Sequence, residues 1–472
     1  MKRSLWTLVA CLVLLSTLVS ACAAPAPQVV EKQVIQTQVV EKVVEKEVPV
    51  VQTQIVEKIV EKVVAPTGTP EPEKITLTVW DFKSNEPAGA PYYQMADESF
   101  MAMHPNVTIK RVAQPHTEYY QILGTTIAAK SGPDVIMFHP ASNIFDRKDA
   151  VMALNDYIGD FKDDITGWEG FTYEDGSVLG VPITVQGLAI YFNKALYTQA
   201  GLDPENPPTT WAEMVAACEA IKTTTGKACF TFGDKEGWNA DWWLSIMLNG
   251  MLSAEEQQAW INGEMKMTDP KPQKALELLA EAVELGWFPE GAASTAMFPD
   301  SFEIFERGDA AHVVGLTSDV ANWKEFADFL GDKNLGVMKG LITDETVFAS
   351  ADELPFVNSA GIGFAVASWT PHPDMAVEFV KHMASKENLQ NYHLYAAAMV
   401  SRKDFDTALI SSTAGKQIVA WAAGLNATTF HQWMPQAVVQ EHERQGQLLL
   451  TAATTPAEAA AAIQKVWDAE AK

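Results

Sequence analysis

The sequence has little positive charge. Its 34 lysine and arginine residues are outnumbered by 60 aspartate and glutamate residues, which leaves a formal net charge of −26 over 472 residues. Proteins that grip nucleic acid need clustered cations to replace the counterions of the phosphates, and adhesion to anionic lipid needs a basic patch. The composition therefore argues against nucleic acid as a partner and disfavours anionic ligands, whereas neutral and cationic small molecules remain open.

Sequence signatures of catalysis are also lacking. No G-x-S-x-G nucleophile elbow occurs in the chain. His442-Glu443 lacks the second histidine of a zinc protease helix, and neither Gly226-Lys227 nor Gly415-Lys416 continues into the serine or threonine of a phosphate-binding loop. Nothing in the sequence predicts a catalytic residue, a metal site or a cofactor.

One apolar run stands out, but it is short. It extends from Leu5 to Val19 behind two basic residues and ends in small residues, which is typical of a signal peptide over residues 1–21. A membrane-spanning helix would need about 20 apolar residues. The end of the run, Val19-Ser20-Ala21-Cys22, resembles the lipobox of bacterial lipoproteins, which implies that Cys22 carries the lipid that anchors the chain to the cell membrane. An ordinary secretory signal is the alternative.

Cysteine is scarce beyond this point. Only Cys218 and Cys229 follow residue 22, and they lie 11 residues apart in a chain that is predicted to be exported. A disulfide can persist outside the cytoplasm, where it would join the helix after Trp211 to the next strand. Two buried thiols are the alternative.

Residues 22–74 contain no leucine and no aromatic residue. The segment Gln36–Lys46 returns sixteen residues later as Gln52–Lys62, with isoleucine in place of two valines, and Pro49 between the copies interrupts any continuous helix. We interpret 22–74 as a low-complexity tether. An oligomerising coiled coil is the alternative, and it would want apolar residues in a heptad pattern.

From residue 75 onward the pattern is that of a globular α/β protein. Strands are predicted at 75–80, 107–112 and 135–138, with helices over 91–103 and 119–130 between them. Such an alternation is typical of a parallel sheet covered on both faces, and ligands of these sheets bind beyond the carboxyl ends of the strands. Further strands are predicted at 228–232, 310–315 and 360–367, and further helices after Thr209-Thr210 and at 238–252, 254–262, 273–285, 300–307, 320–330, 373–384, 386–396, 413–424 and 456–470.

Nine segments resemble, in the same order, those of a known family. They include Ser131-Gly132-Pro133-Asp134, Pro208-Thr209-Thr210-Trp211, Phe305-Glu306-Arg307-Gly308-Asp309 and Ser359-Ala360-Gly361. The chain resembles the family 1 extracellular solute-binding proteins of carbohydrate ABC importers, to which the maltose- and maltodextrin-binding proteins belong. The resemblance covers residue 75 to the C-terminus.

This resemblance implies a two-lobe periplasmic-binding-protein fold of the type II kind, in which each lobe is a mainly parallel sheet flanked by helices and a hinge connects the lobes. The first lobe would comprise residues 75–185 and about 310–368, and the second 186–309 and about 369–472. The chain would cross between lobes at Val185–Gly187, near Ala310–Ser318 and near Ala365–Pro371. Gly187 would absorb the hinge motion, or else mark a strand bulge.

The resemblance also implies a ligand site between the lobes. Aromatic rings bind the C–H faces of sugars and planar polar groups bind their hydroxyls, so both kinds of side chain must meet in one cleft. Where the family's sugar-binding pattern usually has a stacking tryptophan, this chain has Leu316-Thr317-Ser318. That departure weakens the case for maltodextrin. The residues expected at the ligand are Trp80, Asp81, Asn85, Phe138, His139, Ser142, Gln186, Trp238, Asn239, Asp241, Trp242, Thr317, Ser318, Trp323, Ser359 and Trp433.

The predicted function is that of a non-enzymatic, monomeric lipoprotein outside the cytoplasm. It would bind a carbohydrate, an oligosaccharide for preference, and deliver it to the permease subunits of an ABC transporter. The same fold with another solute, such as a polyamine, is an alternative. An extracellular glycan-processing enzyme and an adhesive surface protein are further alternatives.

Overall fold

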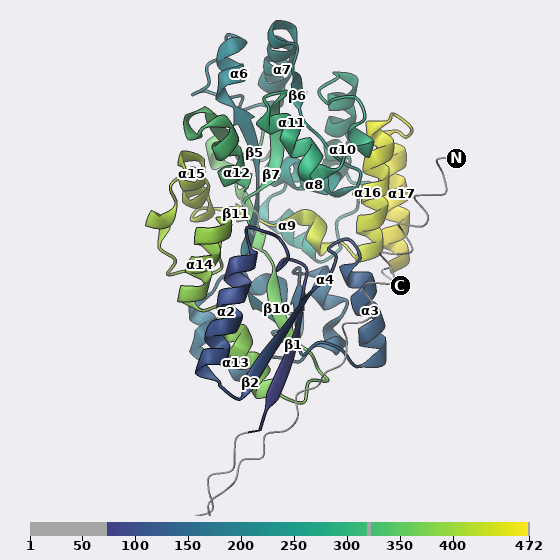
Figure 1. Ribbon diagram of the computed structural model, residues 1–472. Coiled ribbons are helices and arrows are strands. Elements are labelled where there is room, and N and C mark those ends of the chain that lie inside the picture. Colours follow the sequence, from purple (N-terminus) through teal and green to yellow (C-terminus); the bar gives the residue numbers. More distant parts are fainter. Residues whose placement is uncertain (1–72, 319–321, 471–472) are drawn as a thin grey trace, which may run out of the picture. The chain divides into compact units, whose positions relative to one another are not determined.

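The computed structural model describes residues 73–318 and 322–470, so the predicted signal peptide, Cys22 and the tether lie outside the described residues. The described chain forms two β-sheets flanked by helices (Figure 1). Among the described residues, no helix combines the length and the apolar character that crossing a membrane requires.

The first sheet has the order β2-β1-β3-β10-β4. Strand β1 pairs in parallel with β2 and β3, as predicted, whereas β10 runs antiparallel to β3 and β4. Thr78 and the other β-branched and apolar residues of β1 alternate between the two faces of the sheet, which is why Leu77 and Val79 are fully buried. The strands are β1 (Ile75–Asp81), β2 (Val107–Ala113), β3 (Val135–Phe138), β4 (Val181–Pro182) and β10 (Gly363–Val366).

The second sheet has the order β11-β9-β5-β7-β6, and β8 also pairs with β5. Strand β5 runs antiparallel to β7, β8 and β9, so the expectation of a mainly parallel sheet is wrong for this half. The reason is that the long β5 enters from the first sheet and its partners return the chain in the opposite direction. The strands are β5 (Val185–Asn193), β6 (Ala228–Phe230), β7 (Ala310–Leu316), β8 (Leu335–Met338), β9 (Phe356–Ala360) and β11 (Asn426–Ala427).

Two separate hydrophobic cores define two lobes. The core of the first lobe contains side chains of α2 (Ala90–Met103), α3 (Tyr119–Ala129), α4 (Ser142–Phe145), α5 (Asn155–Ile158), α13 (Pro373–Met383) and α14 (Lys386–Ala396). The core of the second lobe contains side chains of α6 (Lys194–Gln199), α7 (Trp211–Thr225), α8 (Trp238–Met251), α9 (Ala254–Ile261), α10 (Pro270–Glu284), α11 (Phe302–Glu306), α12 (Asn322–Leu330), α15 (Thr413–Ala422), α16 (Gln436–Leu450) and α17 (Pro456–Glu470). Most predicted helices are present, but α16 was not predicted as a separate helix.

Side chains that cap the first turn determine where two of the helices begin. Thr210 is the N-cap of α7, as expected of Thr209 or Thr210, because its hydroxyl accepts the N–H of Glu213 at 3.1 Å while Glu213 Oε2 accepts the N–H of Thr210 at 3.1 Å. Ser253 forms the same capping box with Glu256 at the start of α9.

The lobes divide the sequence differently from the prediction. Strands β7, β8 and β9 belong to the second sheet, so assigning about 310–368 to the first lobe is wrong for residues 310–360. Helices α13 and α14 pack in the first core, where Tyr392 stacks on Tyr92 at 4.2 Å, so assigning them to the second lobe is also wrong. Figure 1 shows α14 beside α2. The first lobe is thus 75–184 with 361–398, and the second is 185–318 with 322–360 and 399–470.

The chain crosses between the lobes at 183–184, at 361–362 and at 397–401. These three segments hydrogen-bond to one another. Ile183 N–H donates to Ile362 O at 2.9 Å, Ser401 N–H donates to Ile183 O at 3.1 Å, and the Thr184 hydroxyl accepts Ile362 N–H at 3.0 Å. The predicted crossings near 310–318 and 365–371 are therefore wrong, since β7 stays within one sheet and β10 within the other. We call the three bonded segments the hinge.

Gly187 is not the hinge residue. It lies inside β5, paired with Asn358 of β9 and accepting the N–H of Thr317 at 2.9 Å. A Cβ at this position would overlap the Thr317 hydroxyl and lie 2.9 Å from Val357 O. The absence of a side chain lets neighbouring strands approach, which is a packing role.

Candidate functional site

Three loops of the first lobe bring aromatic side chains together at the carboxyl ends of their strands. Phe82 follows β1, His116 follows β2 and His139 follows β3, and the Phe82 ring stacks with both imidazoles at centroid distances of 4.6 Å. The Tyr120 hydroxyl lies 2.9 Å from His139 Nδ1 and accepts the backbone N–H of the same residue at 2.9 Å. These contacts give the first lobe a fixed aromatic wall.

The wall faces the second lobe. The ring of His116 lies 5.5 Å from that of Trp238, the first residue of α8, between centroids. Trp238 packs partly on the core of the second lobe and is partly exposed. The lobes therefore meet across these two rings.

A second contact between the lobes lies at α4. Phe145 is 6.1 Å from Trp433, whose indole N–H donates to the Thr428 hydroxyl at 2.6 Å. Nearby is a narrow gap that has no room for a water molecule, lined by Pro140, Ala141, Glu169, Gly170, Ser359, Ala360, Gln432 and Trp433. Ligand pockets usually measure about 300–1,000 Å³, so the lobes must separate here to admit a ligand. We call the space between the lobes at these residues the cleft.

Polar side chains form a chain of hydrogen bonds at the cleft. Gln432 Nε2 donates to Gln186 Oε1 at 2.9 Å, and the Thr429 hydroxyl bonds to Gln432 Oε1. The Thr429 hydroxyl also lies 2.8 Å from that of Ser359 in β9. Bonds along this chain fix the orientation of the Gln186 amide on β5.

A cluster of carboxyl and imidazole groups lies where α8 packs on α16. Asp241 Oδ1 lies 2.7 Å from His442 Nδ1, and both side chains are buried. Burial raises the pKa of Asp241 well above its usual range and lowers the pKa of His442 to about 4. Burial, with the charge of Asp241 nearby, also raises the pKa of Glu443 to about 9.

Two further groups join this cluster. Ser245, one turn after Asp241 on α8, has its hydroxyl 3.2 Å from His431 Nδ1. Burial first, and then the neighbouring imidazoles of His442 and His139, lower the pKa of His431 to about 3. The contact between Ser245 and His431 joins α8 to residues 430–433, the segment that carries Trp433.

The N-terminus of α8 already holds a carboxylate. Asp234 Oδ1 accepts the N–H of Ala240 at 3.0 Å, inside the first turn of the helix. Asp234 is fully buried, and burial raises its pKa to about 8. One N–H group of this helix end is therefore already bonded within the protein itself.

Some buried polar atoms near this helix end have no hydrogen-bond partner among the described residues. They are Asp234 Oδ2, both amide atoms of Asn239 and Gln445 Oε1. Leaving such groups unsatisfied costs about 1–3 kcal/mol each, so a bound molecule that satisfied them would gain that energy.

Eight of the residues predicted from the sequence lie at the cleft or on an element that contacts it: His139, Ser142, Gln186, Trp238, Asn239, Asp241, Ser359 and Trp433. That any of them binds a ligand stays a prediction.

Other predicted residues have structural roles. Trp80 packs on the first core from within β1, and Phe138 is fully buried in β3. Trp242 and Trp323 are buried in the core of the second lobe, and Asn85 is exposed in the loop after β1. The structure does not bring these five side chains into the cleft contacts described above.

Asp81 is a structural residue as well. Its Oδ1 accepts the N–H groups of Lys83 and Ser84 at 2.9 and 2.7 Å, and its Oδ2 accepts Nη1 of Arg111 at 2.9 Å. Both carboxylate oxygens are thus used to close the turn after β1. Thr317 and Ser318 are buried beside the hinge, where Ser318 O accepts the N–H of Met399 at 3.0 Å.

The sequence did not single out several residues of the cleft. His116, Glu169, His431 and Gln432 were not predicted as site residues, and neither was the buried His442 that contacts Asp241. His442-Glu443 was considered only as a fragment of a zinc motif, and its closeness to Asp241 depends on the packing of α16 on α8.

One described group of side chains has the spacing of metal ligands: Cys218, Cys229 and His312. The structure joins Cys218 and Cys229 in a disulfide, the pairing favoured from the sequence, with a Cα–Cα distance of 5.0 Å. Both sulfurs are therefore bonded to each other and are not thiolate ligands. His312 Nε2 lies 2.7 Å from the Tyr197 hydroxyl, which further occupies this group.

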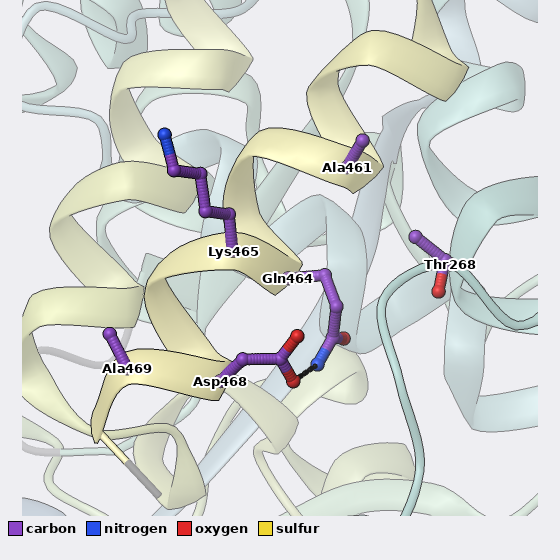
Figure 2. A pocket seen from close by; sticks show the side chains of 6 residues that line it. All are labelled: Thr268, Ala461, Gln464, Lys465, Asp468 and Ala469. Atoms are coloured by element: carbon purple, nitrogen blue, oxygen red, sulfur yellow. Dashed lines mark hydrogen bonds between the residues drawn. The ribbon is translucent and has the colours of Figure 1, made fainter. Parts of the chain in front are cut away.

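A larger hollow of about 490 Å³ lies at α17, away from these residues. It is lined by Thr268, Ala461, Gln464, Lys465, Asp468 and Ala469 (Figure 2). Gln464 Nε2 donates to Asp468 Oδ1 at 2.9 Å within it. No aromatic side chain lines this hollow, and it shares no residue with the cleft.

Comparison with known proteins gives a consistent result. A family model of bacterial extracellular solute-binding proteins matches residues 95–408. The sn-glycerol-3-phosphate-binding periplasmic protein UgpB of Escherichia coli (strain K12) is 23% identical over 284 residues, which is 58% of each chain. The chain thus spans a little over half the length of this curated relative.

Two solved structures are similar over most of the chain. One was described with xylan utilization by the thermophilic bacterium Caldanaerobius polysaccharolyticus, with a TM-score of 0.72, 20% identity and coverage of 83% of this chain and 99% of the other. The other is a chitin oligosaccharide binding protein, with a TM-score of 0.72, 18% identity and coverage of 83% and 98%. These similarities confirm the predicted α/β fold with two sheets flanked by helices.

Proposed function

Because this chain belongs to the family of bacterial extracellular solute-binding proteins, we propose that it captures a carbohydrate in the cleft and delivers it to the permease subunits of an ABC transporter. An oligosaccharide is the preferred ligand. The observation that carries the proposal is that partly exposed tryptophans and planar amides lie along the contact between two lobes.

The chemistry of the cleft suits a sugar. Trp238 and Trp433 offer ring faces for the C–H groups of a pyranose, since aromatic side chains combine large apolar area with a fixed shape. The amides of Gln186 and Gln432 each carry both a donor and an acceptor for neighbouring hydroxyls. The chitin oligosaccharide binding protein and the structure linked to xylan utilization share this fold and support the same class of ligand.

The similarity to UgpB favours a second candidate, sn-glycerol 3-phosphate, because that protein is named for binding this molecule. The surroundings of the α8 N-terminus count against it here. Asp234, Asp241 and Glu443 surround the N-terminus of α8, and helix N-termini are where phosphate groups commonly bind. A phosphate would therefore meet carboxyl groups where it needs N–H donors.

The hinge provides the means to couple binding to transport. Closing the lobes on a ligand would bring surfaces of both lobes into one relative arrangement that a permease could recognise, and the ligand stabilises that arrangement by its differential affinity. We further propose that the chain is a monomer without enzymatic activity, and that a lipid on Cys22 holds it at the outer side of the cell membrane while 22–74 gives it reach. A lipid with two acyl chains anchors a protein stably, whereas one chain is marginal.

Thermal shift against a panel of ligands tests the proposal. A ligand at 100 times its Kd should stabilise the protein by about 2.7 kcal/mol. We expect oligosaccharides to raise the melting temperature and sn-glycerol 3-phosphate to leave it unchanged. Stabilisation by putrescine or spermidine alone would show that the ligand is not a sugar, and release of shorter products from an oligosaccharide would establish an enzyme instead.

A further inference from the structure

We propose that Glu169 contacts the ligand and selects uncharged oligosaccharides over acidic ones. This inference rests on the proposed function and names the class of sugar. Glu169 belongs to η3 (Trp168–Phe171) of the first lobe, and it lines the narrow gap of the cleft together with Ser359, Gln432 and Trp433. Its carboxylate would accept hydrogen bonds from sugar hydroxyls and repel an anionic group on the same sugar.

The backbone of the second sheet holds one oxygen of this carboxylate. Glu169 Oε1 accepts the N–H of Ala360 at 3.1 Å, and Ala360 is the last residue of β9, directly before the hinge crossing at 361–362. Glu169 is nevertheless exposed. Within 73–318 and 322–470, its Oε2 has no hydrogen-bond partner. One oxygen therefore fixes the orientation of the carboxylate, and the other is available to a ligand.

The close packing of η3 determines where Glu169 lies. A Cβ at Gly170 would overlap the Cβ atoms of both Ala360 and Pro140, so the bare backbone of this residue lets η3 lie directly against the end of β9. Gly170 O also accepts the N–H of Ala141 at 2.7 Å, in the loop after β3. These contacts hold Glu169 where the first lobe, the hinge and β9 meet.

A hydrogen-bond donor lies on the other side of the same strand end. Ser359, the neighbour of Ala360, stands opposite Gln186 in the pairing of β9 with β5. Gln432 occupies Gln186 Oε1, whereas Gln186 Nε2 has no partner in the described part of the chain. The end of β9 is thus flanked by an amide donor and a carboxylate acceptor. Neighbouring sugar hydroxyls can satisfy both because each hydroxyl donates and accepts, whereas an ionised carboxyl group only accepts.

The charge of Glu169 is not needed for its structural bond. A glutamine oxygen at this position could accept the N–H of Ala360 equally well. No lysine or arginine among the described residues forms an ion pair with Glu169, so its charge is not balanced by a neighbouring side chain. An acidic sugar in the gap would meet this charge directly, and the repulsion of two like charges opposes binding.

Isothermal titration of the purified protein at pH 7 tests the inference. The ligands are xylotetraose, cellotetraose and maltotetraose, each paired with a tetrasaccharide of the same sugars that carries one glucuronic acid. We expect a neutral tetrasaccharide to bind at least about tenfold more tightly than its acidic partner. Glu169→Gln keeps an acceptor for Ala360 N–H but removes the charge. It should weaken binding of the neutral sugar about tenfold and remove most of the preference, because hydrogen bonds to charged groups are the stronger ones.

Glu174→Gln is the matched control. Glu174 is exposed five residues further along the chain, and it does not line the gap. Its replacement makes the same change in net charge, so it should leave both affinities and their ratio unchanged.

Salt gives a second readout that needs no variant. The Debye length falls from about 10 Å at 0.1 M salt to about 3 Å at 1 M, so the repulsion between an exposed carboxylate and an acidic sugar is screened. The preference of the unaltered protein for the neutral tetrasaccharide should therefore shrink between these two concentrations of sodium chloride. A preference that depends on shape alone would stay constant.

The outcomes separate this inference from the proposed function. A preference for the neutral sugar that neither Glu169→Gln nor salt reduces would overturn the role of Glu169 and leave carbohydrate binding standing. Tighter binding of the acidic partner by the unaltered protein would do the same. Absence of binding to all six tetrasaccharides would count against both the inference and the proposed function.

Discussion

Gln432 Nε2 donates a hydrogen bond to Gln186 Oε1 across 2.9 Å, and this bond joins η9 (Phe430–Trp433) to the start of β5, 246 residues away in sequence. Gln186 sits two residues after the 183–184 crossing, and Gln432 is next to Trp433. The hydrogen bond thus connects the amide of Gln186, which lies next to the hinge, with the segment that carries Trp433 at the cleft.

Replacing Trp238 by alanine should weaken ligand binding about tenfold or more, because a sugar would lose the ring face that lies opposite His116. Titration of the ligand found by thermal shift measures the effect. Trp421→Ala is the matched control. Its partly buried ring packs on Phe356 rather than on the first lobe, so it should lower stability but leave the Kd unchanged. Equal losses of affinity in both variants would contradict the role of Trp238.

Replacing Gly361 by alanine should destabilise the protein by about 1–3 kcal/mol, because the new methyl group would overlap the Thr184 hydroxyl and lie 3.0 Å from Thr184 O. Denaturant unfolding measures this loss, and small-angle scattering with and without ligand should show impaired closure. Gly124→Ala in α3 is the control. No atom lies within 4 Å of the added methyl group, and alanine favours helix by about 1 kcal/mol.

Removing the disulfide by Cys218→Ala with Cys229→Ala should cost about 2–3 kcal/mol in unfolding free energy, on the entropy of a loop closed over 11 residues. The bond joins α7 to β6, far along the fold from the hinge, so ligand affinity should stay within a factor of about two. Mass spectrometry of the unaltered protein should show a gain of about two mass units on reduction. Labelling of both cysteines without reductant would refute the bond.

Stability should fall as pH rises from 6.5 towards 8. The pKa of Asp234 is about 8 in the folded chain and its ordinary value is 3.8, so across this range the folded state still holds a proton that the unfolded state has released. His312, with its pKa lowered by burial to about 4, acts in the opposite direction, but only below its ordinary value of 6.5. Asp234→Asn should therefore reduce the loss of unfolding free energy between pH 6.5 and 8 by about 1 kcal/mol, which melting curves across this pH range measure.

Glu441→Gln controls for the change of charge. The pair with Arg444 lowers the pKa of Glu441, so this carboxyl is ionised in both states above pH 6.5 and its removal should leave the slope unchanged. A wild-type melting temperature that is constant or rises between pH 6.5 and 8 would count against a protonated Asp234.

Individual strands and helices follow from the sequence where their signals are local. Alternating residues in 75–80 and the capping pair of Thr210 and Glu213 act within one strand or one turn, and the structure has these elements where they were predicted. The lobe to which a strand belongs cannot be predicted from local signals. The sequence of β7 is compatible with either sheet, and only its pairing with the distant strand β5 assigns it to the second.

The site was predictable to a similar extent. Trp238 and Gln186 could be predicted at the cleft because the family resemblance assigns their segments to it, and the structure has both residues there. From the sequence, Asp81 could either bind a ligand or close a turn. In the structure its carboxylate accepts a hydrogen bond from Arg111 on the neighbouring strand, a contact that the sequence around Asp81 does not reveal. The contact of His442 with Asp241 depends on the packing of α16 against α8, which leaves no mark in the sequence near residue 442.

The three crossings between the lobes also determine what a protease could do to this protein. A single cut in the backbone at 183–184, at 361–362 or at 397–401 would leave two covalent connections, so the nicked chain would still migrate as one particle under native conditions. In the nicked chain, twisting of one lobe against the other about either remaining crossing is opposed by the second crossing. In the intact chain, all three crossings permit the lobes to bend about the line that passes through them. The connectivity therefore favours a bend over a twist as the motion that opens the cleft.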